Sequence, residues 1–226
     1  YKYTSLVLET LKKKNIPAIF FELGDNIATR KNDTTYNESS AAKYSKEIAN
    51  TENYLLGSHS LTHPLLTKLD SMTITKEIYG GFDIIQKVTG DTTNLFRPPY
   101  GGINSTVINT LSKRNSKPFM WNIDSRDWAD PVPASIANRV VDEAVKAGRG
   151  IILMHDIHEK TVQSLDMIID SLHAKGFQFI LWNGEKVLSR KDSLLATRGE
   201  INTSNSGNHS KLYREKWALV IGINEY

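Results

Sequence analysis

The stretch GIILMHDIH, residues 150–158, shows how the chain is built. Its first five residues form a short run of mostly apolar side chains, and polar residues follow at once with His155. Short apolar runs of this kind are typical of strands that are covered on both faces, as in a parallel sheet. The stretch therefore predicts a buried strand with a polar side chain at its carboxyl end.

Helical patterns flank this strand on both sides. Apolar residues recur at helical spacing before it, at Ile136, Val140, Val141, Ala144 and Val145, and after it, at Val162, Leu165, Ile169 and Leu172. Further strands are predicted at residues 16–23, 54–58, 94–97, 119–123 and 177–182. Helices are predicted at residues 3–14, 73–89 (with Thr73 as N-cap) and 104–115, and residues 25–50 are expected to mix helix and loop. Strands separated by single helices imply an α/β fold with a parallel sheet, either open or an incomplete barrel.

Composition and charge exclude several classes of protein. The 226 residues are 39% hydrophobic and 23% charged, which is typical of a globular chain. A net charge of +3, spread over scattered lysines, gives no reason to expect a nucleic-acid partner. No apolar run approaches the roughly 20 residues that a transmembrane helix needs. Cysteine is absent, which excludes disulfides, thiolate metal sites and thiol nucleophiles.

The pattern of strands and helices stops near residue 183. Residues 184–210 are predicted to be a linker, because they include the polar run NTSNSGNHS at residues 202–210. The segment WALVIGI, residues 217–223, then reads as a new strand. Residues 1–183 are therefore expected to form one domain, and residues 211–226 the start of a second.

Two histidines follow the predicted strand at residues 54–58. His59 and His63 are four residues apart, so a helical backbone would place them on one face, close enough to share a metal ion. Two surface histidines would give the same spacing. Ser60 stands where a zinc peptidase needs a glutamate, which argues against that class.

Three further polar clusters follow strands. RPPYG, residues 97–101, would place the cation of Arg97 on a rigid turn. DSRDW, residues 124–128, joins two carboxylates to an aromatic ring, and LMH, residues 153–155, ends the strand described first. Taken singly, these could be a proline turn, a capped loop and a structural histidine. Together they lie at the strand ends where parallel folds bind ligands.

The order of these clusters resembles the polysaccharide deacetylases, carbohydrate esterase family four, also called the NodB homology domain. That family has the motifs TFDDG, H[ST]xxH, RxPYG, DxxDW and LxH. The chain carries SHSLTHP, RPPYG, DSRDW and LMH in that order. The resemblance covers about residues 1–183 and implies a distorted (β/α) barrel.

The resemblance also implies a role for each matching residue. His59 and His63 would bind a divalent metal, usually zinc, and His155 would be the general acid, tuned by Asp127. Arg97 would orient the catalytic base, and the Tyr100 backbone N–H would stabilise the oxyanion. Trp128 and Leu153 would form the wall around the acetyl methyl group. The substrate would be an N-acetylated polysaccharide such as peptidoglycan or a chitin oligomer, at the cell envelope or outside the cell.

The first motif, which supplies the base and an acidic metal ligand, is not matched. We therefore expect the chain to lack the first strand of the barrel and the catalytic base. One alternative is a non-catalytic carbohydrate-binding module on a deacetylase fold. Another is a part of a caspase-like multidomain protein, because WALVIGINEY, residues 217–226, resembles the opening strand of those peptidases.

Overall fold

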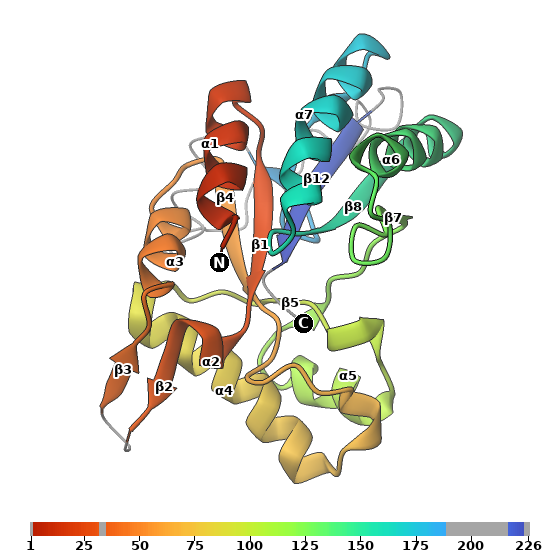
Figure 1. Cartoon of the computed structure of the whole chain (residues 1–226). Coiled ribbons are helices and arrows are strands. Elements are labelled where there is room, and N and C mark those ends of the chain that lie inside the picture. The colour runs from red at the N-terminus through yellow and green to blue at the C-terminus, as the bar shows by residue number, and fades with distance from the viewer. Residues whose placement is uncertain (1, 32–34, 189–216, 224–226) are drawn as a thin grey trace.

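The computed structural model describes residues 2–31, 35–188 and 217–223, and its centre is one eight-stranded sheet. Along the sheet the strands follow the order β6-β5-β4-β1-β12-β8-β7, and β9 also pairs with β12 (Figure 1). Every pair in this sheet is parallel. The strands are β1 (Ala18–Glu22), β4 (Tyr54–Ser58), β5 (Leu95–Phe96), β6 (Lys117–Pro118), β7 (Ile123–Asp124), β8 (Arg149–His155), β9 (Gln178–Phe179) and β12 (Trp217–Ile223).

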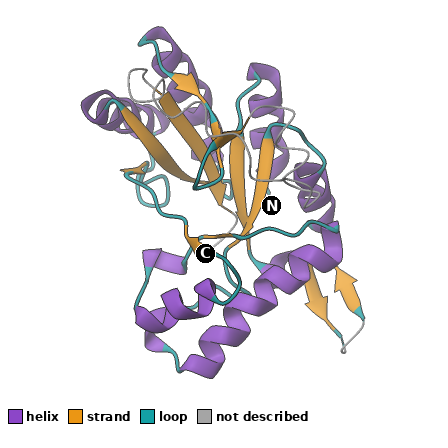
Figure 2. Cartoon of the chain, turned by 180° about the vertical axis from the view of Figure 1, so that it is seen from behind, coloured by secondary structure: helices purple, strands orange, loops and turns teal. Residues whose placement is uncertain are grey.

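In the view from behind, the strands face the viewer and the helices lie beyond and below them (Figure 2). The helices are α1 (Thr4–Lys14), α2 (Gly24–Ile27), α3 (Ala42–Ala49), α4 (Ser71–Thr89), α5 (Ser105–Ser112), α6 (Pro133–Ala147) and α7 (Glu159–Ala174). Two 3-10 turns, η1 (Leu66–Lys68) and η2 (Pro99–Gly101), follow β4 and β5. Two antiparallel hairpins complete the described elements: β2 (Ala28–Arg30) with β3 (Tyr36–Glu38), and β10 (Leu181–Trp182) with β11 (Val187–Leu188). The predicted parallel α/β architecture is thus confirmed.

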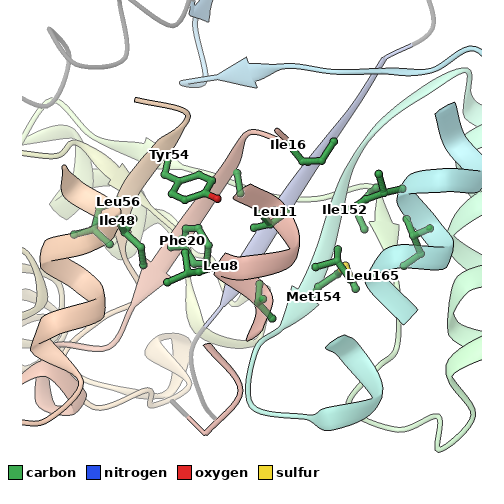
Figure 3. Packing of buried hydrophobic residues seen from close by; sticks show 14 of the residues in the cluster. Leu8, Leu11, Ile16, Phe20, Ile48, Tyr54, Leu56, Ile152, Met154 and Leu165 are labelled. Atoms are coloured by element: carbon green, nitrogen blue, oxygen red, sulfur yellow. The ribbon is translucent and has the colours of Figure 1, made fainter. Parts of the chain in front are cut away.

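The central strands are apolar on both faces because both faces are covered. In β1, Phe20 belongs to the large cluster under the helices, whereas its neighbour Phe21 packs in a second cluster on the opposite face. Met154 and Leu153 of β8 divide between the same two clusters. Figure 3 shows the helix-side cluster, in which Leu8 and Leu11 of α1 lie over the sheet.

The sheet curves strongly. Its end strands β6 and β7 are consecutive in the chain, with only residues 119–122 between them, although five other strands lie between them in the sheet. Such a short link brings the two ends of the sheet near each other, as a distorted barrel requires. These four residues were predicted to be strand, and that prediction is wrong, because they cross from the end of β6 to the start of β7.

The long helix α4 begins two residues before the predicted start. Asp70, and not Thr73, is its N-cap: the Asp70 carboxylate accepts hydrogen bonds from the backbone N–H groups of Met72 and Thr73, at 2.9 and 3.0 Å. A carboxylate at this position satisfies N–H groups that have no partner in the first turn.

The strand β12 fills the centre of the sheet. Its residues 220–223 pair with β1, and its whole length pairs with β8. The sequence predicts that a central strand is missing, and in the structure β12 occupies a central place. The predicted boundaries at residues 183 and 210, and a second domain at residues 211–226, stay predictions, since residues 189–216 and 224–226 lie outside the described part of the chain.

Among residues 2–31, 35–188 and 217–223, none of the helices combines the length and the apolar character that crossing a bilayer demands.

The position of β12 predicts that its loss destabilises the sheet. Val220 lies between Ala18 of β1 and Ile152 of β8, so Val220→Pro removes one backbone donor from the middle of the sheet. We expect a loss of about 1–3 kcal/mol, the usual cost of leaving a buried polar group without a partner. Thermal unfolding would measure this loss, and hydrogen exchange would show faster exchange in β1 and β8 than in α5. A variant that ends at Leu188 and keeps wild-type stability and exchange would instead show that β12 belongs to a separate unit.

Candidate active site

His59 and His63 face each other beyond the carboxyl end of β4. His59 Nδ1 lies 2.6 Å from the carbonyl oxygen of Arg97, which can only accept, so Nδ1 carries the proton and Nε2 presents its lone pair. His63 Nε2 lies 3.1 Å from His59 Nε2. Both side chains are buried. The structure thus brings the two predicted metal ligands together through their Nε2 atoms.

The backbone between these histidines is not helical, contrary to the expectation from their spacing. Ser60 and His63 have φ angles of 76° and 66°, in the left-handed region. His63 N–H donates to Ser60 Oγ at 3.0 Å, which closes the loop. A tight loop, and not a helix face, therefore makes the two rings converge.

Burial keeps both imidazoles neutral. It holds the pKa of His59 well below its usual range, and the nearby His63 lowers it further. Burial, aided by the charge of His155, lowers the pKa of His63 to about 4. Neutral imidazoles are the form that binds a metal ion. The two histidines therefore stay available as ligands down to acidic pH.

The distance between the two nitrogens suits a metal ion. With Zn–N bonds of about 2.0–2.1 Å in a tetrahedron, two histidine nitrogens stand roughly 3.3 Å apart. The observed 3.1 Å is close to this separation. In the described ranges, no group of three or more His, Asp or Glu side chains is placed to hold an ion. The pair thus fits two corners of a metal site.

Arg97 is fully buried beside the histidines, at the end of β5. Its Nε donates to the carbonyl of Phe119 at 3.2 Å. The guanidinium carbon lies 4.4 Å from the ring centre of Phe21 and 5.4 Å from that of Trp121. The aromatic faces stabilise this cation in a place with little water.

The turn after Arg97 carries Tyr100 to the rim of the site. Tyr100 and Gly101 have φ angles of 57° and 66°, so the turn is sharp. The ring of Tyr100 meets the ring of His63 edge-on, with 4.7 Å between their centres, and its side chain is 58% exposed. Solvent thus reaches the site along Tyr100.

His155 forms a buried pair with Asp127. Nδ1 of His155 and Oδ1 of Asp127 are 2.6 Å apart. The other carboxylate oxygen accepts bonds from the backbone N–H of His155 at 2.7 Å and from Thr161 Oγ1 at 2.6 Å. Burial opposes ionisation of Asp127, but the bonds from His155 and Thr161 outweigh it and lower the pKa of this carboxyl. Asp127 is therefore a fixed anion that orients the imidazole.

The remaining predicted residues take different places. Trp128 follows Asp127 and is half-exposed, so its ring can meet a large ligand. Leu153 is buried in the second hydrophobic cluster, the one that contains Phe21, and it lies two residues before His155 on β8. The charge of His155 lowers the pKa of both His59 and His63, which places the three histidines in one electrostatic environment.

Sequence patterns missed several supporting residues. Thr161 holds Asp127, and Glu77 accepts two hydrogen bonds from Thr62. Thr4 donates to Asp156 Oδ2 at 2.6 Å, across 152 positions of the chain, and burial raises the pKa of Asp156 to about 6. These partners come from helices far away in sequence, so local spacing carried no signal for them.

The chain is similar in sequence to known proteins. The family profile named polysaccharide deacetylase matches residues 1–118, just over half of the chain. The peptidoglycan-N-acetylmuramic acid deacetylase PdaC of Bacillus subtilis is 34% identical over 178 residues, which are 78% of this chain and 34% of that protein. The chain therefore spans about a third of the length of this relative.

Solved structures share the fold. The structure of PdaC from Bacillus subtilis has a TM-score of 0.66 at 31% identity and covers 79% of this chain and 80% of its own. A CE4 family pseudoenzyme from Bacillus anthracis has a TM-score of 0.67 at 26% identity, covering 78% of this chain and 58% of its own.

The histidine geometry predicts that His59→Ala and His63→Ala each weaken binding of a divalent cation. Loss of a supporting partner costs about 10–100-fold in metal affinity, so loss of a ligand is expected to cost at least as much. Zinc titration followed by calorimetry measures this affinity. His173→Ala is the matched control, because His173 is exposed at the end of α7. Wild-type affinity in both site variants would contradict the assignment.

Proposed function

Because the chain belongs to the polysaccharide deacetylase family, we propose that it hydrolyses the N-acetyl amides of a polysaccharide. The observation that carries the proposal is the convergence of a neutral histidine pair with a carboxylate-bound histidine at the carboxyl ends of parallel strands. This constellation suits an amide hydrolysis that needs both an activated water and a proton donor.

The proposed substrate is an N-acetylated glycan of the cell wall or a chitin-like oligomer. Relatives are named as deacetylases of peptidoglycan N-acetylmuramic acid, of peptidoglycan N-acetylglucosamine and of chitooligosaccharides. The exposed rings of Tyr100 and Trp128 provide surfaces on which a sugar can lie. A substrate of this kind places the protein at the cell envelope or outside the cell.

His59 and His63 would hold a divalent cation, for which we propose zinc. Bound there, the ion would polarise the acetyl carbonyl and lower the pKa of a water molecule. The two rings suit this task because they are neutral and their Nε2 atoms converge. The Arg97 carbonyl fixes the orientation of the His59 ring.

His155 would deliver the proton that the leaving nitrogen needs. During hydrolysis the attacking water would give one proton to the catalytic base as its oxygen bonds to the acetyl carbon, the C–N bond would break, and the nitrogen would take a proton from His155 Nε2. Acetate and a free amine result. The Asp127 carboxylate engages Nδ1, so Nε2 is the nitrogen left to exchange the proton.

The turn at residues 98–101 would stabilise the oxyanion that forms on the acetyl oxygen. In our proposal the backbone N–H of Tyr100 donates to this oxygen, and the sharp turn holds the donor in place before the reaction. Leu153 and Trp128 would line the space for the acetyl methyl group. Arg97, buried among aromatic rings, would orient the carboxylate that acts as base.

We assign no residue of the sequence as this catalytic base. The family's first motif, TFDDG, is not matched in the sequence, and the described residues add no third acidic or histidine ligand to the pair. This feature favours a second candidate function, a non-catalytic carbohydrate-binding module, and a pseudoenzyme is among the similar structures. The intact His59, His63, Asp127 and His155 favour the enzyme.

One comparison separates these two functions. We expect residues 1–226 alone to release little acetate from an N-acetylglucosamine oligomer. A chain that carries the upstream coding sequence should release acetate, lose this activity with a chelator and regain it with zinc. An upstream sequence without paired acidic residues at a strand end would favour the binding module. Strong activity of residues 1–226 would show that the base lies within them.

The role of His155 gives a further prediction. In the active form, His155→Ala should lower turnover by roughly 10²–10⁴-fold, the usual contribution of general acid–base catalysis, because the leaving nitrogen loses its proton donor. Zinc content should stay near the wild-type value, as measured by elemental analysis. His158→Ala is the control, since His158 is a nearby histidine outside the Asp127 pair. Full activity of His155→Ala, or loss of zinc together with activity, would assign His155 another role.

A further inference from the structure

The loop that carries the metal-binding pair is conformationally costly. Ser60 and His63 both adopt positive φ angles, 76° and 66°, and neither is glycine. Side chains with a Cβ atom rarely adopt this region unless surrounding contacts impose it. The loop therefore needs support from outside itself.

The helix α2 supports the loop on one side. The backbone N–H groups of Gly24 and Asp25 donate to the carbonyls of Ser60 and Leu61, each at 3.0 Å. These bonds hold the first half of the loop against the end of β1. They do not reach the second half of the loop, from Thr62 to His63, which therefore needs support from another element.

The helix α4 supplies that element through Glu77. One carboxylate oxygen accepts from the Thr62 backbone N–H at 2.9 Å, and the other accepts from Thr62 Oγ1 at 2.7 Å. Glu77 is buried. Bonds to an ionised acceptor are stronger than bonds between neutral groups, and burial strengthens them further.

Two glycines allow α4 to approach so closely. A Cβ atom on Gly81 would lie 2.5 Å from Ser58 Oγ and 2.7 Å from the carbonyl oxygen of Ser60. A Cβ atom on Gly80 would press on Leu61 at 3.1 Å. Glycine weakens a helix interior, so two in succession are best explained by the contact they permit.

We propose that Glu77 is a positioning residue for the metal site. Thr62 lies directly before His63, so the two bonds to Glu77 fix the chain at the point where the second ligand leaves it. With Glu77 in place, His63 Nε2 is held 3.1 Å from His59 Nε2. The inference rests on the proposed function in one respect, namely that the pair binds a cation.

Four variants test the inference. Glu77→Gln keeps the size of the side chain but replaces one acceptor by an amide donor. Thr62→Val removes the hydroxyl at nearly constant volume, whereas Thr62→Ser keeps it. Asp91→Asn is the control for a buried carboxyl group, since Asp91 is 5% exposed and lies in the loop after α4, outside the segment from His59 to His63.

Zinc affinity is the first measurement, by calorimetry on metal-free protein. We expect Glu77→Gln and Thr62→Val to weaken zinc binding by about 10–100-fold, the usual effect of losing a supporting partner. Thr62→Ser and Asp91→Asn should stay near wild type. Wild-type affinity in Glu77→Gln and Thr62→Val would overturn the inference.

A second measurement needs no metal. Nitrogen-15 chemical shifts of the histidine rings report the surroundings of the ring nitrogens, and so they are sensitive to the contact between His59 and His63. Glu77→Gln should shift the His63 ring signals while those of His155 stay in place, and thermal unfolding would identify any variant that fails to fold. Absence of zinc binding in the wild type would refute the proposed metal site alone. Unchanged His63 signals in Glu77→Gln would refute the role of Glu77 alone.

Discussion

Backbone hydrogen bonding across the centre of the sheet is the constraint on which this structure depends. The strands β1 and β8 lie on either side of β12, which pairs with β8 along its whole length and with β1 through residues 220–223. A buried backbone group without a partner costs as much as a lost hydrogen bond, and here two strand edges would be exposed together. His155 at the end of β8 keeps its place relative to β1 and β4 only while this gap is filled.

The buried histidines of the site have different surroundings. At His59 and His63 burial is the main cause of the lowered pKa values, and it leaves neutral rings that can bind a cation. His155 is buried as well, but its Nδ1 lies 2.6 Å from the buried Asp127 carboxylate, which fixes the orientation of the ring. In the proposed function this difference would separate the two candidate ligands from the candidate proton donor, since Asp127 contacts His155 directly.

The sequence predicted the parts of the fold that depend on local pattern. The period of apolar residues was sufficient to find α6, β8 and α7, and the motifs identified His59, His63, Asp127 and His155. Local pattern could not show that residues 217–223 pair with β1, because that contact joins residues some 200 positions apart. Local pattern also failed for residues 119–122, which are not strand. There Phe119 and Trp121 pack against Arg97 and the second hydrophobic cluster. Glu77 and Thr161 were missed for the same reason, since their partners are remote in sequence.

The register of the central strand links the fold to the chemistry. Ile223, at the end of β12, lies level with Phe21 of β1 and with His155 of β8. Any strand in this place therefore has its carboxyl end beside His155, and only β1 separates it from β4, the strand that His59 follows. In the family's first motif, acidic residues follow a strand, and a strand in this place would deliver them to the same edge. The place that β12 occupies in the sheet is therefore also a place from which an acidic side chain could reach the edge where the histidines lie.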